Sequence, residues 1–162
     1  MRVTYNGQCK IEENTEELIT QAIEFYARDL LTGDQYDSVK IQVNFFDGLL
    51  KNNNVYAQTG PTTKQWFENQ TMANFAINID SGLSRNVLLK TLAHETVHVH
   101  QFMSGRLRPI DDSSYIWCGK LYHHNADANR EPYEIDANGR EVYLFQDFMR
   151  LLKKSKNALT KN

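Results

Sequence analysis

The sequence predicts an α+β fold in a single domain. Three observations indicate this class: three long segments of helical periodicity, two short segments that alternate apolar and polar residues, and the absence of internal repeats or linkers. The 162 residues have a formal net charge of −2, with 41% hydrophobic and 23% charged residues, which is typical of one globular domain. This composition excludes a largely disordered chain.

The first helix is expected near the N-terminus. Asn14 or Thr15 can cap it, and it continues to about Leu31, where Gly33 can terminate it. Its apolar residues recur at steps of three and four and predict one buried face: Leu18, Ile19, Ala22, Ile23, Tyr26 and Leu30.

Strands are expected in the segments that follow. Residues 38–46 alternate apolar and polar side chains, and Asp47-Gly48 directly after them is typical of a hairpin turn. Residues 75–80 alternate in the same way, and residues 55–58 form a short additional candidate. A small, mostly antiparallel sheet is therefore expected.

Two further helices are expected in the second half. Ser84 can cap a helix over residues 85–104, and Pro132 suits the first turn of a helix that continues to about Lys154. Residues 115–122 fit either strand or irregular structure, and the basic tail 155–162 is expected to fray from the 1–154 domain. The apolar side of the last helix is predicted to comprise Ile135, Val142, Phe145, Phe148, Met149 and Leu152.

All five histidines lie between residues 94 and 124, and two of them belong to an HExxH motif, His94-Glu95-Thr96-Val97-His98. Residues four apart on a helix differ by only about 40° around its axis, so His94 and His98 can bind one zinc ion. Glu95 is adjacent to the first ligand, where it can act as a general base and acid. His100 lies about 200° around the helix from His98 and cannot share the metal.

A catalytic zinc site usually has three protein ligands, so a third must come from elsewhere in the chain. Glu134 is attractive because the start of a rigid helix would present it. Spacing alone also leaves His123, His124 and three acids as candidates: Asp111, Asp112 and Asp127.

Four segments of the sequence together resemble a known family. They are the HExxH motif, Gln101-Phe102, the stretch Trp117-Cys118-Gly119-Lys120, and the segment Pro132-Tyr133-Glu134-Ile135-Asp136-Ala137. In this order they resemble the SprT-like and minigluzincin-type zinc metallopeptidases of bacteriophages. The resemblance covers about residues 70–150.

This resemblance implies a zincin-like fold, in which an N-terminal helix and a small sheet pack on the HExxH helix. It also implies that Glu134 is the third zinc ligand. Many gluzincins have an acid four residues further on, where this chain has Asn138, a residue that can orient a histidine ligand through a hydrogen bond. Candidates for stabilising the oxyanion near the metal are Tyr122, His123, His124 and Tyr133.

The predicted function is zinc-dependent hydrolysis of peptide bonds in a peptide or protein substrate, with Glu95 as general base and acid. A zinc-stabilised binding module without catalytic activity is the alternative, but such a module does not need a general base beside the metal. An extended substrate could add as a strand to residues 75–80. Two cysteines, no apolar run long enough for a membrane span and no signal segment predict a cytoplasmic protein, in a host cell if a phage encodes it.

Nucleic acid is not expected as a partner, although the chain has two features that nucleic-acid-binding proteins use. The cations near the C-terminus suit the negative end of the last helix: Arg150, Lys153, Lys154, Lys156 and Lys161. The aromatic residues Trp66, Phe67 and Trp117 are expected in the core rather than stacked on bases. A near-neutral net charge also argues against such a partner.

Overall fold

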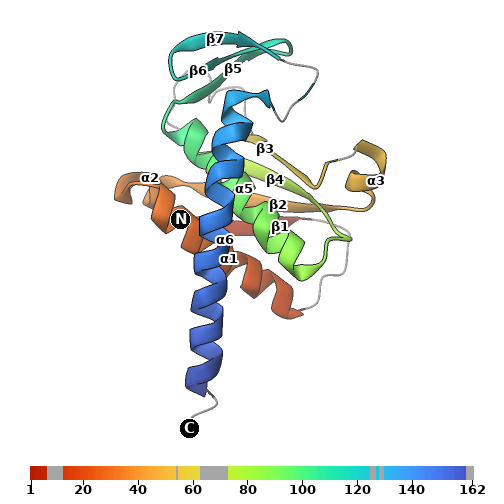
Figure 1. The fold of residues 1–162 in the computed structure, drawn as a ribbon, viewed down its shortest axis with the longest axis vertical. Helices are drawn as coiled ribbons and strands as arrows, with labels where there is room; N and C mark the ends of the chain where they lie inside the picture. Colours follow the sequence, from red (N-terminus) through yellow and green to blue (C-terminus); the bar gives the residue numbers. More distant parts are fainter. Residues whose placement is uncertain (7–12, 54, 63–72, 125–126, 128–129, 160–162) are drawn as a thin grey trace.

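The computed structural model describes residues 1–6, 13–53, 55–62, 73–124, 127 and 130–159 (Figure 1). None of the helices in these ranges is both long and apolar enough to cross a membrane. The described elements are, in chain order, β1 (Arg2–Asn6), α1 (Glu13–Leu30), α2 (Gly33–Ser38), β2 (Lys40–Phe46), α3 (Leu49–Asn53), β3 (Ala57–Pro61), β4 (Asn74–Asp80), α5 (Arg85–Met103), β5 (Leu107–Asp111), β6 (Ser114–Trp117), β7 (Lys120–His123) and α6 (Pro132–Leu159).

The main sheet has four strands in the order β1-β2-β4-β3. Both β1 and β4 are parallel to β2, and only β3 is antiparallel to its neighbour β4. The sheet is therefore mixed, and the expectation of a mostly antiparallel sheet is wrong. Asp47-Gly48 does not form a hairpin. The chain continues from these residues into α3, and both neighbours of β2 in the sheet are parallel to it. Gly48 takes a positive φ of 74° there, which suits a glycine.

One face of this sheet is apolar and covered by helices. Alternate residues of β2 and β4 are buried on it: Ile41, Val43, Phe45, Phe75, Ile77 and Ile79. They form the core together with the buried faces of α1 and α5, and α6 packs across both helices (Figure 1). The other face is polar: Asn44 donates to the side-chain oxygen of Asn78 at 2.7 Å. This alternation explains why the period-two pattern identified both strands.

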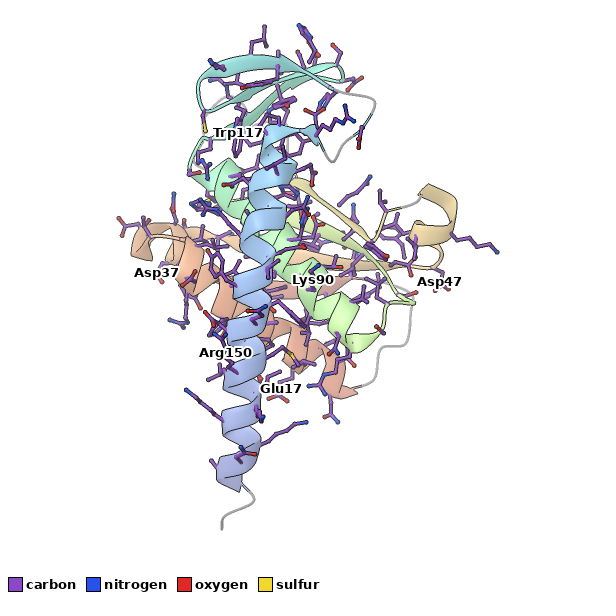
Figure 2. All side chains as sticks on the ribbon, in the orientation of Figure 1. Glu17, Asp37, Asp47, Lys90, Trp117 and Arg150 are labelled. Atoms are coloured by element: carbon purple, nitrogen blue, oxygen red, sulfur yellow. The ribbon has the colours of Figure 1, made fainter. Side chains whose placement is uncertain are left out.

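A second, three-stranded antiparallel sheet follows α5 in the order β5-β6-β7. Trp117 pairs with Lys120, so Cys118 and Gly119 alone form the turn between β6 and β7. Their φ values of 48° and 83° are both positive, as a two-residue turn with the twist of a hairpin requires. The ambiguous segment 115–122 is therefore a hairpin. Figure 2 shows Trp117 at this sheet, beyond one end of α5.

Several helix boundaries differ from the expectation. The first helix begins at Glu13, so Asn14 and Thr15 are inside it. Gly33 begins α2, and Thr32 caps this helix. The backbone N–H of Gln35 donates to the hydroxyl of Thr32, and the backbone N–H of Thr32 donates to the side-chain oxygen of Gln35. The last helix continues to Leu159, so residues 155–159 are helical rather than frayed.

The predicted apolar side of α6 is confirmed at four of its six positions: Phe148 is buried, and Phe145, Met149 and Leu152 pack against the core. Ile135 and Val142 are instead 58% and 45% exposed, and Ala137 and Leu144 are buried. The expected core residues Trp66 and Phe67 lie outside the described residues.

Candidate metal centre

Two histidines of α5 and one glutamate of α6 converge at one point. The Nε2 atoms of His94 and His98 are 3.0 Å apart. One carboxylate oxygen of Glu134, Oε2, lies 3.0 Å from the first nitrogen, and the other, Oε1, lies 3.5 Å from the second. Among the described residues, these three form the group whose donor atoms all lie within 4.8 Å of one another.

These separations fit a metal ion of the size of zinc. In a tetrahedral site with zinc–ligand bonds of 2.0–2.1 Å, neighbouring donor atoms are about 3.3 Å apart. The observed separations of 3.0, 3.0 and 3.5 Å bracket that value. Two imidazole nitrogens and one carboxylate also form a donor set that zinc accepts, and three protein ligands leave a fourth position open.

The ring of His94 is fixed from behind by a second carboxylate. Its Nδ1 lies 3.1 Å from Oε2 of Glu141, which is seven residues, about two helical turns, beyond the ligand glutamate. Lys90 holds the other oxygen of Glu141 at 3.0 Å. Burial alone would lower the pKa of His94, but the hydrogen bonds to Glu134 and Glu141 outweigh it and raise this pKa to about 10. A carboxylate behind a metal-binding histidine fixes the ring and strengthens its donor nitrogen.

The carboxylate of Glu134 is held in its charged form. Burial favours the neutral acid, but hydrogen bonds from His94 and His98 lower the pKa of Glu134 to about 2. Metal binding requires this deprotonated form, so the site does not have to remove a proton from its acidic ligand at neutral pH.

The ring of His98 has a neutral partner. Its Nδ1 lies 2.8 Å from the side-chain oxygen of Gln101, and the amide nitrogen of Gln101 donates to the backbone oxygen of Tyr133 at 2.9 Å and to Asp136 at 3.0 Å. The first turn of α6 is thus bonded to α5 directly behind the ligand pair.

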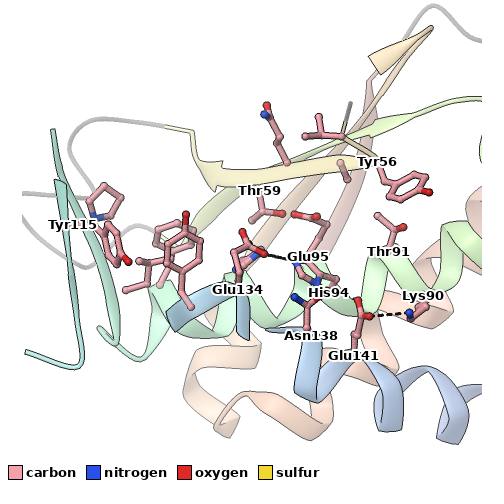
Figure 3. A pocket seen from close by; sticks show the side chains of 18 of the residues that line it. Tyr56, Thr59, Lys90, Thr91, His94, Glu95, Tyr115, Glu134, Asn138 and Glu141 are labelled. Atoms are coloured by element: carbon pink, nitrogen blue, oxygen red, sulfur yellow. Dashed lines mark hydrogen bonds and ion pairs between the residues drawn. The ribbon is translucent and has the colours of Figure 1, made fainter. Parts of the chain in front are cut away.

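Glu95 is buried beside the two ligand histidines and does not belong to the donor cluster. Its Oε2 has no hydrogen-bond partner among the described residues, and neither does the buried hydroxyl of Thr59, which faces Glu95 from β3 (Figure 3). Burial raises the pKa of Glu95, and the opposing effects of His98, His94 and the nearby hydroxyl of Thr59 do not cancel it. An orphaned oxygen on a buried carboxylate is unusual in folded proteins.

The cluster opens into a cleft of about 1200 Å³ (Figure 3). One wall is β3 with the two residues before it, and the opposite wall is the start of α6, with α5 as the floor. Tyr115 lies at the end toward the small sheet, and Lys90 lies toward the other end. A metal held by the three donors would therefore be accessible to an elongated ligand.

The edge strand of the main sheet that borders the cleft is β3, which pairs only with β4 among the described residues. The expected docking strand, residues 75–80, is β4, which is covered by β2 and β3 on its two sides. The carbonyl of Tyr56 accepts from Asp80 and the N–H of Thr62 donates to Asn74, at 2.9 and 3.0 Å. Because alternate residues of an antiparallel pair bond to the partner, the backbone groups of residues 57 and 59 point to the open edge.

Four of the other predicted site residues have different environments. Tyr133 and Asn138 line the cleft, and burial raises the pKa of Tyr133 to about 12, so its hydroxyl keeps its proton at neutral pH. His123 is exposed on β7 and does not line the cleft. Tyr122 stacks on Tyr115 with ring centroids 5.6 Å apart, also outside the cleft lining.

His124 lines the cleft but is not part of the donor cluster. Its Nδ1 lies 3.7 Å from the buried carboxylate of Glu131, which also accepts a hydrogen bond from the hydroxyl of Tyr115. Of the acids considered as third ligands, Asp127 is paired with Arg130 at 3.2 Å, and Asp111 accepts hydrogen bonds from Ser113 and Ser114. Asp112 is exposed.

His100 lies away from the cluster, as its helical angle predicts. Burial lowers its pKa, and the charges of Arg140 and Arg106 lower it further. Its Nδ1 is buried without a hydrogen-bond partner among the described residues.

Sequence reasoning missed several residues that contact the cluster. The sequence does not predict the roles of Glu141, Gln101, Asp136 and Thr59. The spacing of Glu134 and Glu141, seven residues apart on one helix, puts both on the same face and could have identified Glu141. Thr59 and Gln101 have no comparable sequence signal.

Comparison with protein-family models, with curated proteins and with solved structures finds no match to this chain. The geometry of the site itself is therefore the basis for assigning a function.

Proposed function

We propose that this protein is a zinc-dependent peptidase. The observation that carries the proposal is the combination of three converging donors with a buried glutamate next to them, at the floor of an open cleft. His94, His98 and Glu134 would hold the ion. Bound there, zinc would supply a Lewis acid that polarises a substrate carbonyl and acidifies water.

Glu95 would act as the proton carrier. Its orphaned Oε2 is available to take a proton from the attacking water and to deliver it to the nitrogen of the leaving amine. Its raised pKa favours this exchange, since a carboxylate that is too weak a base would not retain the proton. The neutral hydroxyl of Tyr133 and the ring of His124 line the same cleft and are the candidates for stabilising the negative charge on the carbonyl oxygen.

An extended peptide would bind along β3. The backbone groups of residues 57 and 59 are oriented toward the open edge and can pair with a peptide backbone as an added strand. Such pairing would lay the peptide over Glu95, because Thr59 faces that residue across the cleft (Figure 3). Main-chain pairing recognises peptides as a class, which favours a peptide over other hydrolysable substrates.

The open cleft argues for catalysis over a purely structural zinc site. Structural zinc sites are closed by four protein ligands, whereas the described residues supply three donors here and leave space in front of them. A buried carboxylate without a partner would also cost stability in a module that has no chemical use for it.

The proposal is tested with Glu95→Gln. We expect this variant to keep zinc in a 1:1 ratio and to cleave a proteome-derived peptide library at least about 100-fold more slowly than the wild type, because the amide cannot carry the proton. The matched control is Glu17→Gln on the exposed part of α1, which should cleave at the wild-type rate. A zinc-loaded wild type that cleaves no peptide, or a fully active Glu95→Gln, would contradict the proposal.

A further inference from the structure

The side chain of Gln101 joins three groups that belong to two helices. It is fully buried on α5 and contacts the ring of His98, the backbone of Tyr133 and the carboxylate of Asp136, at 2.8, 2.9 and 3.0 Å. Tyr133 and Asp136 flank the ligand Glu134 in the first turn of α6. One amide therefore contacts the ring of His98 directly, and it also contacts the two residues that flank Glu134 in the sequence region of α6.

The hydrogen-bond partners fix which way the amide points. A backbone carbonyl oxygen and a carboxylate oxygen can only accept, so the atom of Gln101 between them must be the NH₂ nitrogen. The amide oxygen then faces Nδ1 of His98 and can only accept from it. The reversed amide would put oxygen against two oxygens and is excluded.

We propose that Gln101 is a positioning residue that holds His98 with its proton on Nδ1 and its Nε2 turned toward Glu134. A neutral imidazole carries one proton, so a proton fixed on Nδ1 leaves Nε2 with a free lone pair. That lone pair is the one a metal needs. The inference deepens the proposed function and rests on its metal site, and the contact between Nδ1 of His98 and the amide oxygen of Gln101 does not itself involve the metal.

The amide is itself held from behind by charge. Asp136 accepts from Arg106 through both guanidinium nitrogens at 3.2 Å and from Arg140 at 3.2 Å. Burial favours the neutral form of Asp136, but Gln101 and the two arginines lower its pKa. Asp136 therefore stays charged and accepts hydrogen bonds. Arg106 also lies over the ring of Trp117 at 4.6 Å, so the small sheet is connected to the same carboxylate. The amide is thereby prevented from rotating.

The first test measures zinc affinity by competition with a chromophoric chelator. Gln101→Met keeps the volume of the side chain and removes its oxygen and nitrogen, and we expect zinc to bind 10- to 100-fold more weakly, as for other losses of a group behind a metal-binding histidine. The control is Gln35→Met, which removes a glutamine that donates to the backbone of Met103 at 3.1 Å, away from the cleft. Its zinc affinity should equal that of the wild type.

A second variant covers the case in which Gln101→Met does not fold. Asp136→Asn leaves an oxygen for Gln101 but weakens the two arginine pairs, and we expect a smaller loss of zinc affinity of a few-fold. Wild-type affinity in both folded variants would overturn the proposal.

The third test uses NMR of protein with ¹⁵N-labelled histidine and does not need zinc. We expect a slowly exchanging Nδ1–H signal from His98 in both metal-free and zinc-loaded protein. Gln35→Met, which leaves this contact in place, should retain the signal, whereas Gln101→Met should lose it. A wild-type His98 that lacks a proton on Nδ1 would overturn the proposal. A wild type that shows the Nδ1–H signal but binds no zinc would contradict the proposed function alone.

Discussion

The two histidines of the HExxH motif are held by chemically different groups. A charged carboxylate, Glu141, lies behind His94, and a neutral amide, Gln101, lies behind His98. Both groups keep Nε2 directed at the common point, but a carboxylate also makes its imidazole a stronger donor. The site thus combines one strengthened ligand with one whose proton position is fixed.

The contribution of the Glu141 charge to zinc affinity can be measured with a single substitution. Glu141→Gln keeps the shape of the side chain and removes its charge, so we expect zinc affinity to fall about 10- to 100-fold by chelator competition. Lys90→Met is the matched contrast, because it removes only the cation that holds Glu141 from solvent. The side chain of Lys90 is 50% exposed, and partly exposed ion pairs contribute little to stability. The zinc affinity of Lys90→Met should therefore change by no more than a few-fold. Equal affinities of Glu141→Gln and wild type would show that this carboxylate does not support the site.

At the scale of elements, α6 uses one face for two purposes. Glu134, Glu141, Leu144 and Phe148 follow one another at helical spacing on the side that meets α5. The first half of this face is polar and contacts the histidines, and the second half is apolar and belongs to the core. The apolar pattern alone misassigns Ile135 and Val142 to this face, because the glutamates of the metal site occupy two of its positions.

This assignment predicts a difference between two neighbouring aliphatic residues. Leu144 is 1% exposed and Val142 is 45% exposed. Leu144→Ala should lower the free energy of unfolding by about 2–5 kcal/mol, and Val142→Ala should change it by no more than about 0.5 kcal/mol. Denaturant unfolding followed by circular dichroism measures both. A larger loss for Val142→Ala would mean that α6 packs through the face that the sequence pattern suggested.

At the scale of the whole molecule, the cleft lies where three parts meet. The main sheet contributes its edge strand β3, the helical layer contributes α5 and α6, and the small sheet closes one end with Tyr115 (Figures 1 and 3). Arg106 joins the small sheet to α6 through Asp136. A metal bound by α5 and α6 would add one more connection between elements that are 40 residues apart in the chain.

The sequence predicted those parts of the fold that have strong local patterns. The three long helices and the strands β2 and β4 are confirmed because each has a regular apolar face. Strand β1 was missed, since five residues at the chain end carry too short a pattern, and the parallel pairing of β2 with β4 depends on a crossover that no local signal encodes.

The site could be predicted from sequence only where spacing along one helix determines geometry. His94, Glu95 and His98 follow from such spacing, and Glu134 was named from its place at a helix start and from the resemblance. The contacts of Gln101 with Tyr133 and Asp136 and the approach of Thr59 to Glu95 depend on how separate elements pack. They required the structure.

The most direct test of the account is the zinc content of the purified protein, measured by atomic emission beside two variants. We expect about one zinc per chain in the wild type, a marked loss in Glu134→Ala, which removes a ligand from the cluster, and about one zinc in His124→Ala, which lines the cleft outside it. Circular dichroism checks that all three proteins are folded. A folded wild type without zinc after exposure to the metal, or a loss of zinc in His124→Ala but not in Glu134→Ala, would contradict the proposed metal centre.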